Sequence, residues 1–250
     1  MNESASYFMN RRSVRKFSDK PVSDAMLKDM LEKAFHAPTT GNMQLYSVVI
    51  TRTDEGKKAL APAHFSQPAS TGCYAMLTFC ADLNRFCHWC DINGASAGYD
   101  NLQGLMMGIL DATIVAQQFV TIAEMEGLGT CYLGTTTYNA PDIARVLALP
   151  HRVVPVVTIA VGYPDEKPDD CGRLPVDSLV HFEAYANPSD GDIRDMYAEK
   201  ENRVDSRKFV EENGKENLAQ VFTDVRYTRQ ACEQFSKIYS DYIREAGFEL

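Results

Sequence analysis

A short basic segment near the N-terminus is the first candidate for binding chemistry. Residues 11–17 read Arg-Arg-Ser-Val-Arg-Lys-Phe, so four cations lie within six residues beside a hydroxyl group. A guanidinium offers paired N–H donors that match phosphate oxygens, and a serine hydroxyl can add a further hydrogen bond. A solvated basic turn is the alternative for a lone cluster of this kind. The segment therefore indicates a phosphate site only in combination with other elements.

Two weaker candidates follow further along the chain. Arg173 precedes Leu174 and Pro175, a pattern that means little alone. A glycine-rich stretch from Gly127 to Gly134 lacks the order G-x-G-x-x-G and follows a helical pattern rather than a strand. A dinucleotide-binding fingerprint requires that order directly after a strand, so we do not expect one here.

Two patterns imitate other kinds of site. Ser96 is the centre of a G-x-S-x-G sequence, but a nucleophile elbow must follow an apolar strand, and the polar residues before it do not form one. We therefore favour a small-residue loop over a hydrolase. Cys87 and Cys90 form a C-x-x-C, yet a zinc site needs a second such cluster nearby. Cys80 fits a small core residue of an apolar strand, and no metal is expected.

Alternating helical and extended patterns must position these residues. Ser23 is a predicted N-cap, and the apolar residues after it recur at helical spacing. Strand signals are few, which favours an α+β sandwich over a doubly wound sheet. The predicted elements are helices at 24–35, 111–127, 141–149 and 230–246, strands at 47–51, 75–81 and 153–161, a turn at 37–42, and a loop at 187–192 before a charged segment at 194–217.

Two of these elements carry specific expectations. The helix over 111–127 is apolar on nearly every face, so it is predicted to be buried in a core or between subunits. The strand over 153–161 contains Pro155, which cannot donate a hydrogen bond to a neighbouring strand. We therefore predict a strand that tolerates the edge of its sheet.

The composition limits the class of protein. With 250 residues, 45% hydrophobic and 24% charged, the chain suits one globular domain with a C-terminal extension. A net charge of -9 argues against nucleic acid and anionic membrane surfaces as partners. We expect no signal peptide over residues 1–10 and no stretch that reaches the ~20 apolar residues of a membrane span. Seven scattered cysteines favour a cytoplasmic, reducing compartment over a disulfide framework.

Taken together, these segments resemble the nitroreductase and flavin reductase family, in particular the larger oxygen-insensitive nitroreductases with a C-terminal extension. The likeness covers residues 8–185, and its specificity lies in the order of the pieces. They are Arg11–Phe17, Ala37–Gln44 (with Thr39 and Gly41), Cys80–Asp82, Asp111–Gln117, Gly127–Gly129, Leu149-Pro150, Arg173–Pro175 and His181.

The resemblance implies a fold and an assembly. The expected fold is a nitroreductase-like three-layer α+β sandwich around a central, mostly antiparallel sheet. It would form an intertwined homodimer with two FMN molecules at the subunit interface. Residues 1–185 would be the FMN-binding domain, and residues 186–250 an extension that packs on the dimer.

The resemblance also assigns cofactor contacts by motif position. Arg11, Arg12 and Ser13 would hold the FMN phosphate and ribityl end, and Arg173 would reach the phosphate. Arg15 would lie near flavin N1 and act in catalysis, because a cation there stabilises the negative charge of the reduced ring. The residues expected to line the ring are Thr39, Gly41 and Gln44 from the partner subunit, together with Gln67, Leu133 and Gly134.

The implied activity is a ping-pong reaction. NADPH or NADH would reduce the flavin, and a small electron-poor acceptor such as a nitroaromatic, a quinone or a flavin would then take the electrons. A non-catalytic flavin-binding protein of the same fold is the alternative. The sequence departs from the family at Cys171, where relatives often have lysine, and over residues 200–217, which match poorly. The preference between NADPH and NADH therefore does not transfer.

Overall fold

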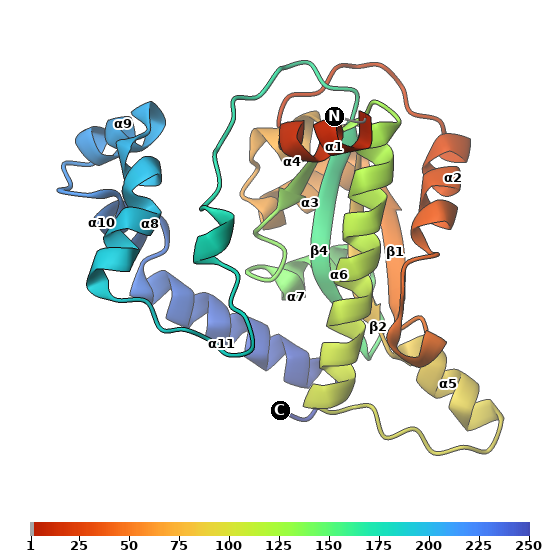
Figure 1. Ribbon diagram of the computed structural model, residues 1–250. Coiled ribbons are helices and arrows are strands. Elements are labelled where there is room, and N and C mark those ends of the chain that lie inside the picture. The colour runs from red at the N-terminus through yellow and green to blue at the C-terminus, as the bar shows by residue number, and fades with distance from the viewer. Residues whose placement is uncertain (1–2) are drawn as a thin grey trace. The chain divides into compact units, whose positions relative to one another are not determined.

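The computed structural model describes residues 3–250, which form two compact units. The first unit comprises the chain up to Pro168 together with Phe235–Leu250, and the second unit is Asp169–Gln234. The course of the chain can be followed in Figure 1. The sheet lies in the first unit, which is therefore the scaffold for most of the predicted site residues.

A four-stranded sheet in the order β1-β2-β4-β3 is the centre of the first unit. All neighbouring strands pair antiparallel. The strands are β1 (Tyr46–Thr51), β2 (Ala75–Asp82), β3 (Gly129–Leu133) and β4 (Val153–Gly162). The predicted α+β class is confirmed. The sequence does not predict β3, because the glycines around its start indicate the end of a helix and a loop.

The prediction of an edge-tolerant strand over 153–161 is wrong. β4 lies between β2 and β3, so it is an interior strand. The register of β2 against β4 shifts between Phe79 and Cys80, where Phe79 faces Val157 and Cys80 faces Pro155. The proline is thus accommodated at a β-bulge, where the ladder does not need its missing donor.

Helices cover both faces of the sheet and make three layers. α2 and α6 pack on one face, while α3, α4, α7 and the turn η2 pack around the other. The helical elements of the first unit are α1 (Glu3–Asn10), α2 (Asp24–Ala34), η1 (Thr40–Asn42), α3 (Asp54–Leu60), η2 (Ala61–His64), α4 (Pro68–Gly72), α5 (Asn84–Ile92), α6 (Leu102–Met125) and α7 (Ala140–Val146). Ser23 caps α2 as predicted, because its side chain accepts a hydrogen bond from the amide of Met26.

The long helix α6 begins at Leu102, before the predicted start at Asp111, because Asn101 caps it. Its 24 residues make it long and apolar enough to cross a membrane, so the expectation that no stretch reaches this length is wrong. However, α6 lies along the sheet and packs on β2, β4 and α2 (Figure 1). This packing is typical of the core helix of a globular protein.

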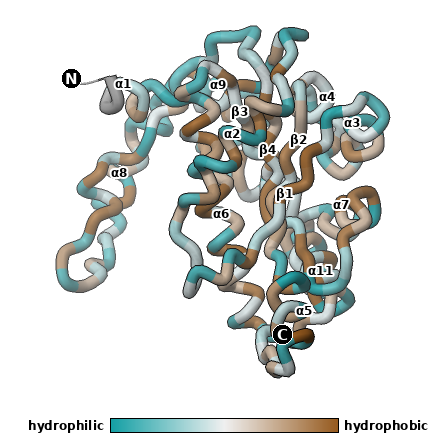
Figure 2. The backbone as a smooth tube through the Cα atoms, turned by 90° about the vertical axis from the view of Figure 1, so that its right-hand side faces the viewer, coloured by the Kyte–Doolittle hydropathy of each residue, from teal (hydrophilic) through white to brown (hydrophobic). Residues whose placement is uncertain are grey.

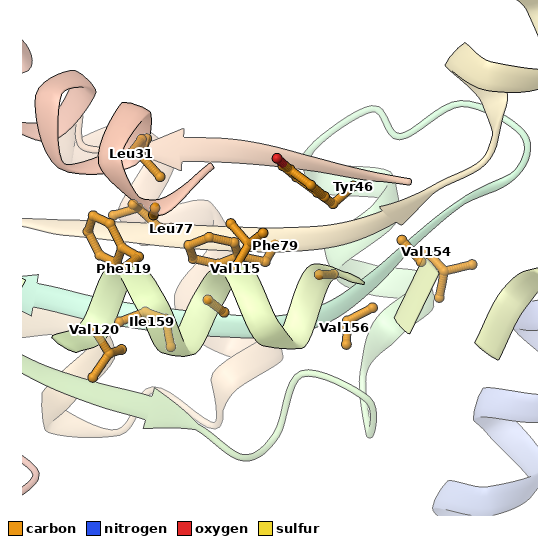
Figure 3. Packing of buried hydrophobic residues seen from close by; sticks show 14 of the residues in the cluster. Leu31, Tyr46, Leu77, Phe79, Val115, Phe119, Val120, Val154, Val156 and Ile159 are labelled. Carbon is orange, nitrogen blue, oxygen red and sulfur yellow. The ribbon is translucent and has the colours of Figure 1, made fainter. Parts of the chain in front are cut away.

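The main core lies between α6, α2 and the sheet. Phe79 of β2 and Phe119 of α6 are fully buried, and their ring centroids are 5.9 Å apart. Leu31, Val115 and Ile159 pack in the same cluster (Figure 3). Burial of such side chains contributes about 1.5–3 kcal/mol each, so this cluster fixes α6 on the sheet.

The second unit is helical and has little core of its own. It contains η3 (Val176–Ser178), α8 (Asp190–Asn202), α9 (Val204–Glu212), α10 (Leu218–Val221) and the π-turn η4 (Phe222–Arg226), and α11 (Arg229–Glu245) begins in it. The loop predicted at 187–192 ends early, because Ser189 and Asp192 form a capping box that starts α8. The hydrophobic and hydrophilic stretches of the chain are coloured in Figure 2.

Candidate functional site

The basic segment 11–17 lies along the edge of the sheet formed by β3. The amide of Val14 donates to the carbonyl of Thr130 over 2.9 Å. Gly129 permits this approach, since a Cβ there would lie 2.7 Å from Val14 Cβ. Phe17 then forms an isolated bridge with Pro164, after β4. The sheet edge therefore fixes the backbone on which the predicted phosphate ligands are placed.

Arg11 has a partner that the sequence does not predict. Its guanidinium lies 3.3 Å from Glu124 Oε1, near the end of α6. The carboxylate of Glu124 also accepts hydrogen bonds from the hydroxyls of Tyr7 and Thr130. Burial and the neighbouring Glu124 raise the pKa of Tyr7 to about 12, so Tyr7 remains a donor. Glu124 thus orients Arg11 at the surface of the first unit.

The other polar residues of the segment are placed differently. Arg12 donates to the carbonyls of Met9 and Arg11, so it closes the end of α1. Ser13 is half-buried. Arg15 exposes its side chain, while its amide donates to Glu166 Oε1 over 2.6 Å. The predicted ligands therefore share a segment, but only Arg15 extends fully from it.

Arg15 and Arg11 are both close to the side of β3. Burial raises the pKa of Cys131 in β3, and the charges of Arg15 and Arg11 oppose that rise. Both positive charges therefore act on this edge of the sheet. An anion at this edge would gain from both charges.

The loop that carries Thr39, Gly41 and Gln44 depends on Asp111. This carboxylate is buried in α6 and accepts hydrogen bonds from the amide and hydroxyl of Thr40 and from the amide of Leu45. Gly41 and Gln44 have φ angles of 54°. Asp111 therefore stabilises a loop whose backbone is unusual at more than one residue, and its role as an anchor is not predicted from the sequence.

One side-chain oxygen of this loop, Thr39 Oγ1, is buried without a hydrogen-bond partner among the described residues. A buried polar atom without a partner is rare and indicates a ligand, a water or a second subunit. Thr39 is one of the residues predicted to line the flavin, and that assignment stays a prediction.

Gln67, Leu133 and Gly134 lie at the other end of β3 from Gly129. Gln67 is half-buried directly before α4, and Leu133 is the buried last residue of β3. Gly134 follows it in an exposed turn. His64, three residues before Gln67, is fully buried, and its side chain forms a hydrogen bond with Thr135. Sequence alone gives no signal for this contact.

A single copy does not bring all predicted residues together. The Thr39 loop is anchored at Asp111 of α6, whereas Arg11 pairs with Glu124 of the same helix. The two anchors are separated by thirteen residues along α6, which corresponds to about 20 Å. In one copy, the residues predicted to contact FMN are therefore anchored at two separate places on α6.

Arg173 belongs to the second unit. Its guanidinium donates to the carbonyl of Gly172 over 2.6 Å. It lines a pocket of about 440 Å³ together with Cys171, Lys200 and Arg203. Cations therefore dominate the polar lining of this pocket, although Glu199 also contributes to it.

The two patterns that imitate a nucleophile elbow and a zinc site lack the structural context that those sites require. Ser96 is exposed in a loop that follows helix α5, so the strand required for a nucleophile elbow is absent there. Cys80 is buried in β2, and burial raises its pKa to about 12, in agreement with a core residue. Within residues 3–250, no three His, Cys, Asp or Glu side chains group as metal ligands.

Comparisons with known proteins show which sequences and folds this chain resembles. The family model described as nitroreductase family matches residues 8–163. An FMN reductase (NADPH) of Bacillus subtilis is 27% identical over 250 residues, 99% of each chain. An oxygen-insensitive NADPH nitroreductase of Salmonella typhimurium is 28% identical over 200 residues, which cover 80% of this chain and 81% of the relative. A solved oxidoreductase structure from Bacteroides fragilis is 46% identical with a TM-score of 0.96, covering 98% of this chain and 100% of that chain.

Proposed function

This chain belongs to the nitroreductase family, and we propose that it is an FMN-dependent oxidoreductase that uses NADPH or NADH to reduce small electron-poor acceptors. The observation that carries the proposal is the arrangement along β3. The basic segment lies beside this strand through Val14 and Thr130, and the turn with Gly134 follows directly after Leu133. The basic segment and the ring-lining residues Leu133 and Gly134 therefore belong to one sheet edge.

Each residue has a role in this proposal that follows from its chemistry. Arg11, Arg12 and Ser13, together with Arg173, bind the FMN phosphate and ribityl end, because guanidinium groups make charge-assisted hydrogen bonds to phosphate. Glu124 keeps Arg11 oriented, at the cost of a negative charge near the phosphate. The ring-lining residues are Thr39, Gly41, Gln44, Gln67, Leu133 and Gly134.

Arg15 is the residue that acts on the reaction itself. FMN, when bound, supplies the hydride and electron chemistry. The exposed guanidinium of Arg15 provides a fixed positive charge where a reduced flavin carries negative charge. No acid, base or nucleophile from the protein is required, which agrees with the ordinary surroundings of Ser96 and Cys87.

The proposal includes a homodimer. α6 buries one face against the sheet, but the large apolar side chains of Leu102, Met106, Leu110 and Ile114 are exposed at intervals of four residues. This spacing places them on one helix face. A second copy would cover this face and would bring the Thr39 loop of one subunit to the Arg11 segment of the other. We expect an obligate interface above ~2,000 Å².

The expected surroundings are those of a cytoplasmic enzyme. All seven cysteines are free, although Cys73, Cys80, Cys87 and Cys131 are buried. Unpaired thiols agree with a reducing compartment. Relatives named FMN reductase and nitroreductase support both donors and acceptors of this class for the present chain.

A test of the two half-reactions separates an enzyme from a flavin-binding protein. FMN-loaded protein is mixed anaerobically with NADPH or NADH, and the visible flavin bands are followed. We expect rapid bleaching, and recovery of the bands when a quinone or nitroaromatic is added. Bound FMN that neither donor reduces would contradict an oxidoreductase and would favour the non-catalytic alternative.

A further inference from the structure

Two loops that are distant in sequence meet at the far end of β3. The first loop contains residues 65–67, between η2 and α4; it follows His64, the last residue of η2, and ends at Gln67. The second loop contains residues 134–139, between β3 and α7, and starts at Gly134. Both Gln67 and Gly134 are proposed to line the flavin ring. The geometry of this edge therefore depends on how the loops are held together.

Two hydrogen bonds join the loops directly. His64 Nδ1 lies 3.0 Å from the hydroxyl oxygen of Thr135. The side-chain amide of Asn139 donates to the carbonyl of Ala63 over 2.8 Å. Each hydrogen bond joins a residue of η2, directly before the first loop, to a residue of the second loop. The pair of loops is thus cross-linked at both ends of the second loop.

An aromatic stack covers the same junction. The rings of Tyr138 and Phe235 are parallel within 7°, with centroids 4.3 Å apart. Phe65 lies 6.3 Å from the same Phe235 ring. Phe235 is part of α11, so the C-terminal helix contributes to the packing of both loops. Such aromatic pairs contribute about 0.5–1.5 kcal/mol beyond the area they bury.

The first loop has an unusual backbone directly after His64. Phe65 and Ser66 have φ angles of 54° and 48°, in the left-handed region that non-glycine residues rarely adopt. Each such residue costs on the order of 1–3 kcal/mol and persists only where its surroundings define it. His64 is the buried residue before this turn, so its hydrogen bond helps to define the direction in which Gln67 leaves it.

The state of His64 suits an anchor rather than a proton carrier. The side chain is fully buried, and burial lowers its pKa to about 4, so the imidazole is neutral near neutral pH. Its Nε2 atom is buried and has no partner among the described residues. Burying an imidazole nitrogen without a hydrogen-bond partner costs free energy, and an apolar residue would fill the same space without that desolvation penalty. The presence of a histidine here therefore indicates a role beyond packing.

We propose that His64 is a positioning residue. Its hydrogen bond to Thr135 holds the loop that ends at Gln67 against the loop that starts at Gly134, and so fixes the position of two residues proposed to line the flavin ring. This inference rests on the proposed function of the site. This hydrogen bond acts through the protein and does not require His64 to touch the cofactor. It explains why a polar residue occupies a buried position beside a strained turn.

The test compares substitutions of the partner hydroxyl in the FMN-loaded dimer and in the cofactor-free protein. Thr135→Val removes the hydroxyl, whereas Thr135→Ser retains it. Thr223→Val is the control, because Thr223 is exposed in the second unit and its hydroxyl bonds the carbonyl of Ala219 and the side chain of Asp224 in its own helical turn. His64→Asn keeps a polar nitrogen near the Nδ1 position, and His64→Leu removes it.

We expect Thr135→Val to slow anaerobic reduction of bound FMN by NADPH roughly tenfold or more, since small misplacements of a reacting group have such effects. In cofactor-free protein, amide hydrogen exchange should rise over residues 64–67 and 134–139. Thr135→Ser and His64→Asn should recover most of both properties. Thr223→Val should leave the reduction rate within about threefold of the wild-type protein.

Several results would overturn the proposal. A Thr135→Val protein that is reduced at the wild-type rate, with unchanged exchange in both loops, would show that the hydrogen bond has no role. A Thr135→Ser protein as slow as Thr135→Val would show that the hydroxyl is not the cause. If His64→Leu fails to fold, the Thr135 pair still decides. Wild-type protein that does not bind FMN would overturn the proposed function as well, whereas normal loading with unaffected variants would overturn only the role of His64.

Discussion

The two units of this chain differ in how they bury apolar side chains. The first unit has a continuous core on one face of its sheet and a second cluster on the other. The second unit buries only Ser206, Leu218 and Val221, while Phe182 is 86% exposed. The first unit thus has the contacts of an independently stable domain, and the second does not.

This difference indicates that the two units have different roles in binding the cofactor. The residues proposed to hold and line the cofactor belong almost entirely to the first unit, where a sheet edge and a buried helix fix them. The second unit contributes Arg173 from an exposed loop. Binding residues on loops rely on a rigid scaffold for their position. We therefore expect substitutions in the core of the first unit to have larger effects than substitutions in the second unit.

The largest effect is expected in the core of the first unit. Phe79→Ala should lower the free energy of unfolding by about 3–5 kcal/mol, because it removes a fully buried ring that packs on Phe119. Urea unfolding can be followed by the fluorescence of Trp89, the single tryptophan, which lies in the first unit.

The matched control is Phe182→Ala in the second unit. It should change the same Trp89 transition by less than about 0.5 kcal/mol, as is usual for exposed positions. A loss equal to that of Phe79→Ala would mean that the two units unfold as one and that the comparison fails.

The next effect concerns the pH dependence of stability. Burial lowers the pKa of His64 from 6.5 to about 4, so the unfolded chain binds a proton between these values and the folded chain does not. Stability should therefore be fully present above pH 6.5 and should fall as the pH drops toward 4, by about 3 kcal/mol from this residue. In His64→Asn this part of the pH dependence should disappear.

If His64→Asn retains the wild-type slope between pH 6.5 and 4, burial of a neutral imidazole is not the cause of the slope.

The structure shows which parts of the fold follow from sequence patterns. The N-cap Ser23 and the apolar runs of β1, β2 and β4 are local signals, and they predict their elements well. β3 and the interior position of β4 depend on pairing between distant strands, which local patterns do not contain.

The site shows the same limit. Motif order indicates the basic segment 11–17, but the partners of its residues come from elsewhere in the fold. Glu124 and Asp111 are distant in sequence from the residues they anchor, and both look like ordinary acidic residues of a helix. His64 likewise has no recognisable partner in the sequence, because its hydrogen-bond partner Thr135 is 71 residues away.

A smaller effect is expected for the phosphate ligands. Arg11→Ala should weaken FMN binding by about 1.5–3 kcal/mol, the range for a hydrogen bond to a charged group. Equilibrium titration of cofactor-free protein with FMN measures this change. Arg52→Ala is a suitable control, because Arg52 pairs with Asp24 away from the basic segment. Equal losses in both variants would argue against a specific phosphate contact of Arg11.

The smallest effect should be seen for Arg15. Arg15→Ala should lower the two-electron potential of bound FMN by roughly 30 mV or more, which corresponds to about 1.4 kcal/mol. The cation favours the reduced form because only that form carries the negative charge. FMN affinity should fall less than in Arg11→Ala. An unchanged potential with FMN still bound would remove Arg15 from the mechanism.

We propose that the basic segment of the first unit holds a flavin by its phosphate. An equilibrium titration of cofactor-free protein with FMN and, separately, with riboflavin, which has the same ring without the phosphate, tests this directly. We expect FMN to bind at least tenfold more tightly, since one charged hydrogen bond already contributes about 1.5 kcal/mol. Equal affinities for FMN and riboflavin, or no binding of FMN, would contradict it.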